Sequence, residues 1–415
     1  RPYRMPPDKT KILKDEVSSL LEQGIIEEAP SNGNSWASPV ILVPKADNSW
    51  RLCTDMRLVN SRTEVDPFPL PRIEELIDRV GSAKYLTKLD MVRGYWQVPL
   101  DSASIPISGF LTPFGHFRWR YMHFGCRNAP ATFSRLVLKL FSGLEMFCAA
   151  FLDDILIFSD NWEDHKRHLS EVLRRIQNAG LTLNLSKSMF AVAELDFLGY
   201  HIGCNRVQPR EKKIAALLQY NRPVDRKSLQ QFLGLAGYYR RFLPNFSHMS
   251  AVLSSLLRKN VEFKWSDEAE KAFVDLKSRL STRPILRPPD FSKEFCMAVD
   301  ASNVAVGGHL FQVIDGVEHP ICFFSKKLDV HQQRYSTVEK EALGLILAVR
   351  AFSVYFGSTK VTVYTDHNPL VFLHKMCNHN QKLLRWCLEL QQYNLNICHR
   401  PGKDNLIPDL LSRAV

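Results

Sequence analysis

The sequence predicts an α+β unit, a basic helical segment and a second unit of α/β type, in that order. Three observations support this fold class. The 415 residues suffice for two or three domains of about 150 residues each. With 45% hydrophobic residues, the chain can bury large cores and is too apolar to be disordered. Helical and strand patterns alternate before and after a mainly helical stretch at residues 209–257.

In the first unit, apolar periodicity predicts a helix over residues 10–28 and strands at 38–44 and 50–56, around a turn at 46–48. The proline-rich run 66–71 stops regular structure, because proline lacks a backbone N–H and restricts the residue before it. The remaining predicted elements are a helix at 72–80, a strand ending at Asp90, a helix at 129–141, a β-hairpin around 151–157 and a helix at 161–179.

The helical stretch 209–257 is predicted to be interrupted at Gly234 and Gly237, and the prolines of residues 282–289 predict a linker. The second unit is predicted to contain strands at 295–300, 304–312 and 361–365, a helix at 338–352 and further helices toward the C-terminus. The predicted domains are therefore 1–204, 205–290 and 291–415.

Charge is distributed unevenly along the chain. The formal net charge is +11, of which residues 205–290 carry +9, whereas residues 1–204 are neutral overall. A basic segment of this kind favours a polyanionic partner such as nucleic acid, and the alternative is a solvated basic linker. The nine cysteines have no C-x-x-C spacing, which argues against a zinc ribbon. No apolar run approaches the ~20 residues of a membrane span, and no targeting signal is recognised.

Two adjacent acids, Asp153 and Asp154, interrupt an apolar strand. Like charges there repel each other and resist desolvation, which favours a metal site, although a type I′ turn that uses the backbone tolerance of Asp is an alternative. Asp90 ends another predicted strand. Three carboxylates on neighbouring strand ends would hold two Mg²⁺ about 4 Å apart and orient an in-line attack on a phosphate. The acids therefore predict phosphoryl transfer.

No G-x-x-x-x-G-K-[ST] motif occurs, so a triphosphate would have to be bound by basic side chains rather than by a P-loop. Lys45 and Arg51 flank the predicted hairpin turn and are candidates for this role. The alternative for each is an ordinary surface charge.

Several motifs occur in an order that resembles the reverse transcriptases of gypsy-class LTR retrotransposons, and the resemblance extends over nearly the whole chain. The matching segments are WASPV at 36–40, Leu89-Asp90, FGCRNAPATF at 124–133, FLDD at 151–154, FLGY at 197–200 and FLGLAGYYR at 232–240. The resemblance implies a right-hand polymerase of fingers, palm and thumb. It assigns Asp90, Asp153 and Asp154 as the metal-binding acids.

The resemblance also implies roles around an incoming deoxynucleoside triphosphate. Lys45 and Arg51 would bind the triphosphate, and Phe124 and Gly125 would border its pocket. Tyr95 would form the floor beneath the sugar, where an aromatic ring clashes with a 2′-hydroxyl and so favours deoxynucleotides.

Lys187 matches the lysine proposed to protonate the leaving pyrophosphate, and its alternative is a solvated loop lysine. The positive charge of residues 205–290 falls on the implied thumb and linker. The basic residues Lys212, Lys213, Arg240 and Arg241 of this segment, with Tyr238 and Tyr239 beside them, are predicted to follow the phosphates of a bound duplex.

The second unit has an acid set of its own, in four short motifs that resemble the RNase H domain of the same family. They are VDAS at 299–302, EKEAL at 339–343, YTDHNPL at 364–370 and DLLSR at 409–413. The resemblance implies that Asp300, Glu341, Asp366 and Asp409 hold two Mg²⁺ and that RNA in an RNA:DNA hybrid is hydrolysed. His399, in a predicted flexible loop, matches a histidine thought to assist product release; a solvated loop histidine is the alternative.

Several residues depart from the family pattern. His123 replaces a usual Pro, Cys126 a usual Leu and Gly109 a usual Ala, all near the nucleotide pocket, which these changes are expected to loosen. His309 occupies a usually small or apolar position of the first RNase H hairpin.

The resulting prediction is an RNA- and DNA-templated DNA polymerase coupled to RNase H cleavage, with two Mg²⁺ per active site and Mn²⁺ as a substitute. Its predicted partners are an RNA template, an RNA:DNA hybrid, a DNA primer and dNTPs, without a membrane, in a cytoplasmic retroelement particle. The alternatives are a decayed or domesticated copy that binds duplex without catalysis and a chain that retains hybrid cleavage alone.

Overall fold

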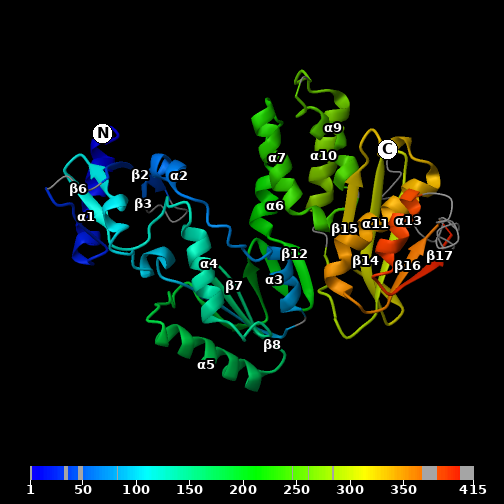
Figure 1. The fold of residues 1–415 in the computed structure, drawn as a ribbon, viewed down its shortest axis with the longest axis horizontal. Coiled ribbons are helices and arrows are strands. Elements are labelled where there is room, and N and C mark those ends of the chain that lie inside the picture. Colours follow the sequence, from blue (N-terminus) through cyan, green and yellow to red (C-terminus); the bar gives the residue numbers. More distant parts are fainter. Residues whose placement is uncertain are drawn as a thin grey trace. The chain divides into compact units, whose positions relative to one another are not determined.

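The computed structural model describes residues 2–31, 36–44, 50–81, 83–244, 246–259, 261–282, 285–366 and 381–401. The chain forms two compact units, residues 1–193 and 194–415 (Figure 1). The division at 204 and 290 stays a prediction. None of the described helices is both long and apolar enough to cross a membrane.

The first unit begins with a helix packed on a five-stranded sheet. α1 (Pro7–Glu22) buries Leu13, Val17 and Leu20 in a core that it shares with this sheet. The predicted extension of this helix to residue 28 is wrong, because Gly24 adopts φ +66° just after the helix and the chain then enters a strand. The sheet has the order β1-β6-β5-β2-β3 and consists of β1 (Ile26–Glu28), β2 (Ser38–Pro44), β3 (Trp50–Thr54), β5 (Phe110–Thr112) and β6 (Gly115–Trp119).

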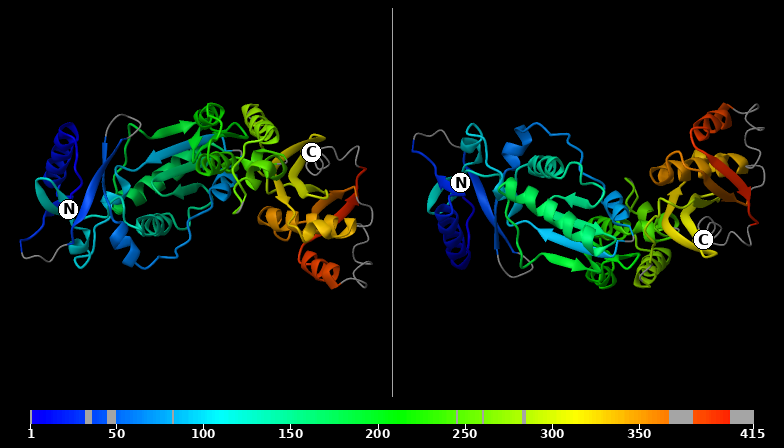
Figure 2. Two further views of the ribbon diagram at one scale, coloured as in Figure 1. Left: turned by 90° about the horizontal axis from the view of Figure 1, so that it is seen from above. Right: turned by 90° about the horizontal axis from the view of Figure 1, so that it is seen from below.

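A four-stranded antiparallel sheet follows, with the order β7-β8-β4-β9. Figure 2 shows the cyan-to-green part of the chain that contains this sheet from two further sides. Alternate residues Leu89, Ile155 and Ile157 pack against the helices α4 and α5 in one core. Because side chains alternate along a strand, Lys88 and Asp90 face the opposite side. The elements of this part are α2 (Arg57–Arg62), α3 (Ile73–Val80), β4 (Tyr85–Asp90), η1 (Gly94–Gln97), η2 (Ile105–Ser108), α4 (Ala129–Leu140), β7 (Cys148–Phe151), β8 (Asp154–Ser159), α5 (Trp162–Asn178) and β9 (Met189–Val192).

The second unit opens with a three-stranded antiparallel sheet and a group of helices. The sheet contains β10 (Glu194–Phe197), β11 (Tyr200–Gly203) and β12 (Arg206–Pro209). Gly234 and Gly237 lie inside one continuous helix, so the prediction that they interrupt the helical stretch is wrong. The helices are α6 (Glu211–Leu218), α7 (Arg226–Tyr238), η3 (Arg240–Phe242), α8 (Phe246–Met249), α9 (Ala251–Ser255) and α10 (Asp267–Ser281).

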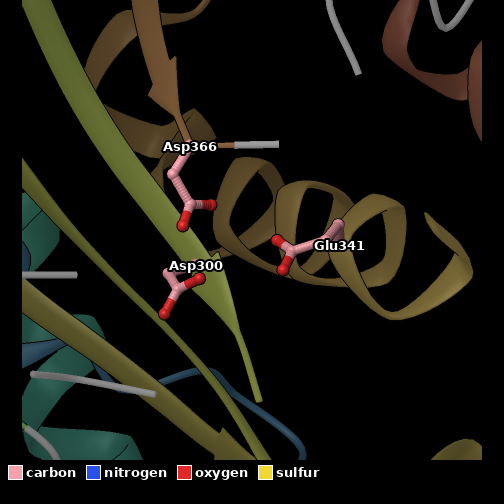
Figure 3. A group of neighbouring side chains, drawn as sticks. All are labelled: Asp300, Glu341 and Asp366. Atoms are coloured by element: carbon pink, nitrogen blue, oxygen red, sulfur yellow. The ribbon is translucent and has the colours of Figure 1, made fainter. Parts of the chain in front are cut away.

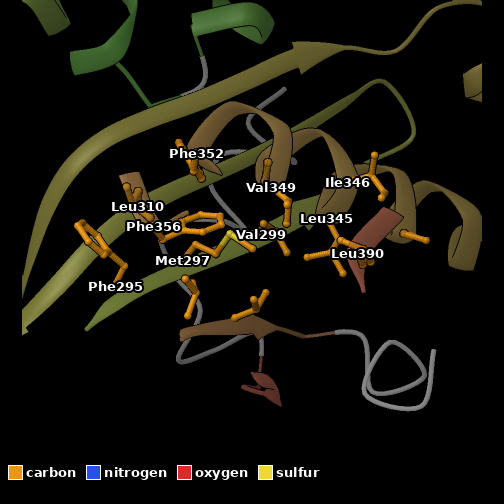
Figure 4. Close-up of a cluster of buried hydrophobic side chains, with 14 of the residues drawn as sticks. Phe295, Met297, Val299, Leu310, Leu345, Ile346, Val349, Phe352, Phe356 and Leu390 are labelled. Atoms are coloured by element: carbon orange, nitrogen blue, oxygen red, sulfur yellow. The ribbon is translucent and has the colours of Figure 1, made fainter. Parts of the chain in front are cut away.

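A mixed five-stranded sheet completes the second unit, with the order β15-β14-β13-β16-β17. β13, β16 and β17 run parallel, and β14 and β15 run antiparallel to their neighbours. The long helix α11 covers one face through Leu345, Val349 and Phe352, which pack on Met297 and Val299 (Figure 4). The elements are β13 (Phe295–Ala301), β14 (Ala305–Ile314), β15 (Val317–Lys327), η4 (Gln332–Arg334), α11 (Thr337–Phe356), β16 (Val361–Thr365), α13 (Gln381–Leu390) and β17 (Leu395–His399).

The predicted linker is hydrogen-bonded to both sheets of the second unit, through β12 and through β15. Leu286 and Val207 exchange two backbone hydrogen bonds of 3.0 Å, and the backbone N–H of Arg287 donates to the carbonyl of Pro320 at 2.9 Å. The short helix α8 also contacts β15, where the Ser247 hydroxyl donates to the carbonyl of Ser325 at 2.8 Å. Residues 285–287 are therefore part of the fold rather than a free connection.

Candidate active sites

The two acids of the hairpin lie at the junction of β7 and β8. Phe151 pairs with Asp154, which leaves Leu152 and Asp153 as the two turn residues. Of these, Leu152 has φ +52°, and Asp153 is not among the residues with positive φ. A type I′ turn needs positive φ at both central residues, so the backbone tolerance of Asp does not explain the acid pair. The left-handed conformation falls instead on a leucine, at a cost of ~1–2 kcal/mol.

The end of β4 brings Asp90 beside this turn, directly opposite Asp154 in the antiparallel pair of β4 and β8. Burial raises the pKa of Asp90, against the opposing positive charges of Lys187 and Lys88. Burial likewise raises the pKa of Asp153, and the negative charges of Asp154 and Asp90 add to the effect. For both carboxylates, burial and the neighbouring acids outweigh the nearby positive charges in their effect on the pKa.

A pocket of about 530 Å³ joins the predicted acids to the predicted nucleotide residues. Within it, the structure brings together five of the predicted site residues: Arg51, Asp90, Phe124, Asp153 and Lys187. The rest of the lining was not predicted from the sequence and consists of Ile12, Glu16, Trp50, Met91, Arg93, Gly94 and Trp96. Lys45 lies outside the described residues.

Aromatic and glycine residues shape one side of this pocket. The Arg51 guanidinium carbon lies 4.4 Å from the Phe124 ring centre, and the Tyr95 ring centre lies 5.2 Å from that of Phe124. Tyr95 does not line the pocket directly and packs behind Phe124. Gly125 has φ +109°, and a Cβ atom there would lie 2.4 Å from the carbonyl oxygen of Thr54. Glycine is thus required at this position on two grounds.

Asp154 has a partner that the sequence analysis did not identify. Its Oδ1 lies 2.8 Å from Nζ of Lys88, in a partly buried ion pair. Strand alternation was the available signal, because Lys88 precedes Asp90 by two residues and therefore shares its face of the sheet. Among the described residues, Asp90, Asp153 and Asp154 do not form a group of three with ligand atoms within 4.8 Å of one another.

Such a group exists in the second unit. One ligand atom each from Asp300, Glu341 and Asp366 lies within 4.8 Å of the others, and Figure 3 shows the three carboxylates turned toward one another. Asp300 and Glu341 are 2% and 5% exposed. The parallel register that pairs Ala298 with Tyr364 brings Asp300 and Asp366 to the same end of the sheet. Asp409, the fourth predicted acid, lies outside the described residues.

His399 lies beside this acid group. The predicted flexible loop is wrong at this position, because His399 is the last residue of β17 and pairs with Thr365 of β16. Its Nε2 lies 3.1 Å from the backbone oxygen of Asp366, and since a carbonyl only accepts, this nitrogen carries the proton. The histidine is exposed to solvent.

The basic segment divides into exposed and buried residues. Lys212, Lys213 and Arg240 are exposed. Arg241 is 6% exposed and Tyr239 1%, so the prediction that these two follow the phosphates of a duplex is wrong. The Tyr239 hydroxyl donates instead to the Gly199 carbonyl at 2.8 Å, next to Tyr238, whose hydroxyl donates to the Leu198 carbonyl.

Two protein families match the chain. Residues 43–202 match the reverse transcriptase (RNA-dependent DNA polymerase) family, and residues 290–393 match the RNase H-like domain found in reverse transcriptase. The retrovirus-related Pol polyprotein from transposon 412 of Drosophila melanogaster is 36% identical over 99% of this chain and 34% of its own length. The Tf2-3 polyprotein of Schizosaccharomyces pombe is 34% identical over 100% of this chain and 31% of its own length. The chain thus spans about a third of these curated relatives.

Solved structures share the fold. A foamy viral protease-reverse transcriptase (dRH) in complex with double-stranded DNA matches with a TM-score of 0.86 at 22% identity, over 96% of this chain and 71% of that one. The protease-reverse transcriptase in complex with an RNA/DNA hybrid matches with a TM-score of 0.78 at 22% identity, over 96% of this chain and 54% of that one. The predicted right-hand polymerase followed by an RNase H-like domain is therefore confirmed as the fold. The chain belongs to the reverse transcriptase and RNase H family of retrovirus-related Pol polyproteins, as its resemblance to gypsy-class LTR retrotransposons indicated.

Proposed function

We propose that this chain is an RNA- and DNA-templated DNA polymerase that extends a primer with dNTPs and cleaves the RNA of RNA:DNA hybrids. The observation that carries the proposal is the pocket of about 530 Å³ in which Asp90 and Asp153 meet Arg51, Phe124 and Lys187. Acids alone are common on protein surfaces. Acids that line one pocket with a cationic and aromatic wall are suited to a nucleoside triphosphate, whose phosphates need positive charge and whose sugar and base need apolar contact.

The residues present fit a divalent cation in the first unit. Asp90 and Asp153 offer hard oxygen ligands, and their pKa values are raised by burial and by the negative charges of neighbouring carboxylates, which a cation would relieve. These two residues, with Asp154, would hold Mg²⁺ or Mn²⁺, two per site in our proposal. Bound there, the metal would supply electrostatic stabilisation of the reacting phosphate.

The chain's own side chains account for substrate binding at this site. Arg51 and Lys187 would bind the triphosphate, together with Lys45, and Lys187 would donate a proton to the pyrophosphate that leaves. Phe124 and Tyr95, in ring contact, would support the sugar, and Gly125 allows the backbone to approach Thr54 closely enough to place Phe124.

The second acid group also fits a cation, since three carboxylates converge from β13, α11 and the end of β16. Asp300, Glu341 and Asp366, with Asp409, would hold it next to the scissile phosphate of the RNA strand. His399, which contacts the Asp366 backbone and is exposed, would assist the departure of the product. The solved relatives bound to double-stranded DNA and to an RNA/DNA hybrid support duplex substrates. A cytoplasmic retroelement particle is the setting that we propose.

Measuring both activities on one preparation tests the proposal. Wild type, Asp153→Asn and Asp366→Asn would be assayed for primer extension on an RNA template and for cleavage of a labelled hybrid, with Mg²⁺ present. We expect Asp153→Asn to lose extension by more than about 100-fold and to keep cleavage, because even outer-shell partners of metal ligands are worth 10–100-fold. Asp366→Asn should show the reverse. Duplex binding without either activity, or cleavage without extension, in the wild type would overturn the polymerase assignment.

A further inference from the structure

His123 and Cys126, two residues that depart from the family pattern, are in contact with each other. Nδ1 of His123 lies 3.0 Å from the backbone oxygen of Phe124, and Nε2 lies 3.4 Å from Sγ of Cys126. A carbonyl oxygen only accepts, so Nδ1 carries the proton and Nε2 is left as an acceptor. The Cys126 thiol therefore donates to Nε2. The hydrogen bond closes a loop around Phe124 and Gly125.

The loop is fixed from behind as well. The His123 ring is fully buried and stacks on Trp119, with ring centres 4.9 Å apart and planes 19° apart. Trp119 in turn donates from Nε1 to the Thr54 hydroxyl at 3.0 Å. Because Thr54 also supplies the carbonyl against which Gly125 packs, the histidine and the glycine are supported by the same strand end. Burial lowers the pKa of His123 to about 4, so the ring is neutral near pH 7.

We propose that His123 and Cys126 act as a positioning pair that sets the place of the Phe124 ring in the nucleotide pocket, and so determines the affinity for dNTPs. This inference rests on the proposed polymerase function. The Phe124 ring contacts both Arg51 and Tyr95, at 4.4 and 5.2 Å, so a displaced ring disturbs the triphosphate and sugar sides together.

The pair is expected to act on nucleotide affinity and not on the chemical step. Asp90 and Asp153 belong to β4 and to the turn after β7, which are separate from the loop 123–126. The two departures therefore support each other through their hydrogen bond, in contrast to the loosening that each residue by itself predicts.

Steady-state single-nucleotide incorporation by the full chain tests the pair. Loss of one hydrogen bond should raise the KM for dNTP about 3- to 10-fold in Cys126→Ala, with kcat unchanged within about 2-fold. Cys126→Ser retains an O–H donor and should return KM to within about 2-fold of wild type. His123→Phe keeps the stacking on Trp119 and loses the acceptor, and the double variant with Cys126→Ala should be no weaker than His123→Phe alone. Cys204→Ala, at an exposed thiol of the second unit, is the matched control.

The outcomes separate positioning from folding and from the proposed function. Partial unfolding reduces the amount of active enzyme and hence the apparent kcat, but it leaves KM unchanged. An unchanged KM in Cys126→Ala, a failure of Ser to restore it, or additive effects in the double variant would overturn the pair. Absence of incorporation by the wild type would instead overturn the polymerase function on which the inference rests.

Discussion

Nζ of Lys88 lies 2.8 Å from Oδ1 of Asp154, across the antiparallel pair of β4 and β8. The two side chains are 21% and 32% exposed, so the ion pair is partly shielded from water. Lys88 thereby places a positive charge among three carboxylates, and its charge also opposes the rise in the pKa of Asp90. We infer that Lys88 competes with a divalent cation for Asp154.

Replacement of Lys88 by Gln should therefore tighten cation binding in the first unit. A neighbouring opposite charge commonly shifts the pKa of a carboxylate by one or more units, a tenfold or larger change in proton affinity. Because the Lys88 pair is partly exposed, we expect a smaller effect, a decrease of about 3- to 10-fold in the Kd for Mn²⁺. Titration of Mn²⁺ followed by electron paramagnetic resonance measures this without reference to activity. Lys84→Gln, an exposed lysine next to the start of β4, is the matched control. An unchanged or weaker Kd in Lys88→Gln would contradict the competition.

Asp153→Asn should stabilise the metal-free protein while it abolishes primer extension. Folding raises the pKa of Asp153, so the folded state binds the proton more readily than the unfolded chain, and stability falls as the pH rises through the raised pKa. Asparagine does not ionise, so the variant avoids this loss of stability at high pH. The melting temperature of the variant in excess chelator should exceed that of wild type, and the difference should be larger at pH 8 than at pH 4. Asp154→Asn, which breaks the Lys88 pair, should show no such gain; a gain confined to pH 4 would refute the explanation.

Gly109→Ala should destabilise the first unit, although alanine is the usual residue of the family there. A Cβ atom at this position would lie 1.9 Å from the carbonyl oxygen of Trp36, so the backbone must move, at a cost of about 1–3 kcal/mol. Gly234→Ala is the contrasting variant. It lies within α7 with no atom within 4 Å of its added Cβ, and we expect a gain of up to about 1 kcal/mol. Calorimetric melting of both variants would contradict this account if their effects had the same sign.

His309→Leu should stabilise the second unit, and more so in acid. The histidine is 2% exposed, and neither ring nitrogen has a hydrogen-bond partner in the described structure. Burial and the charge of Arg400 lower its pKa to about 3, so the stability associated with the neutral ring is present above pH 6.5 and is lost as the pH falls toward 3. We expect a gain of about 1 kcal/mol at pH 7 and about 2 kcal/mol more at pH 5. Calorimetry at both pH values measures it, and a pH-independent difference would argue against the buried neutral ring.

Exposed and buried cations of the basic segment should respond differently to neutralisation. The binding constant for a hybrid falls as salt rises. Arg240→Gln and Lys212→Gln should each make the slope of log K against log salt less steep by about 1, since each would lose one phosphate contact. Arg241 is 6% exposed, so Arg241→Gln should lower the melting temperature and leave the slope unchanged. Fluorescence anisotropy at several salt concentrations distinguishes these outcomes. If all three variants and wild type had equal slopes, residues 205–290 would be a solvated basic linker and not a duplex-binding surface.

Local patterns predicted much of the fold because they depend on few neighbours. Period-2 and period-3.6 hydrophobicity located β4, the hairpin of β7 and β8, α5 and α11 within a few residues. The strand β15 and the strand β17 were missed. β15 follows its partner β14 across the two-residue turn Asp315-Gly316, in which both residues have positive φ, so a local hairpin signal was present. β17 pairs with β16 across a long intervening segment, and pairing of this kind leaves a weak local signal.

By itself, the sequence determined the family and the acids at strand ends, because motif order and the position of a carboxylate after an apolar strand are properties of the chain alone. The tertiary structure decided which of these groups meet. It paired Asp154 with Lys88, placed His399 against the Asp366 backbone, joined His123 to Cys126 and buried Arg241. The physical reason is that strand register and helix packing bring distant segments together, and the resulting burial and charge neighbours set what each side chain can do.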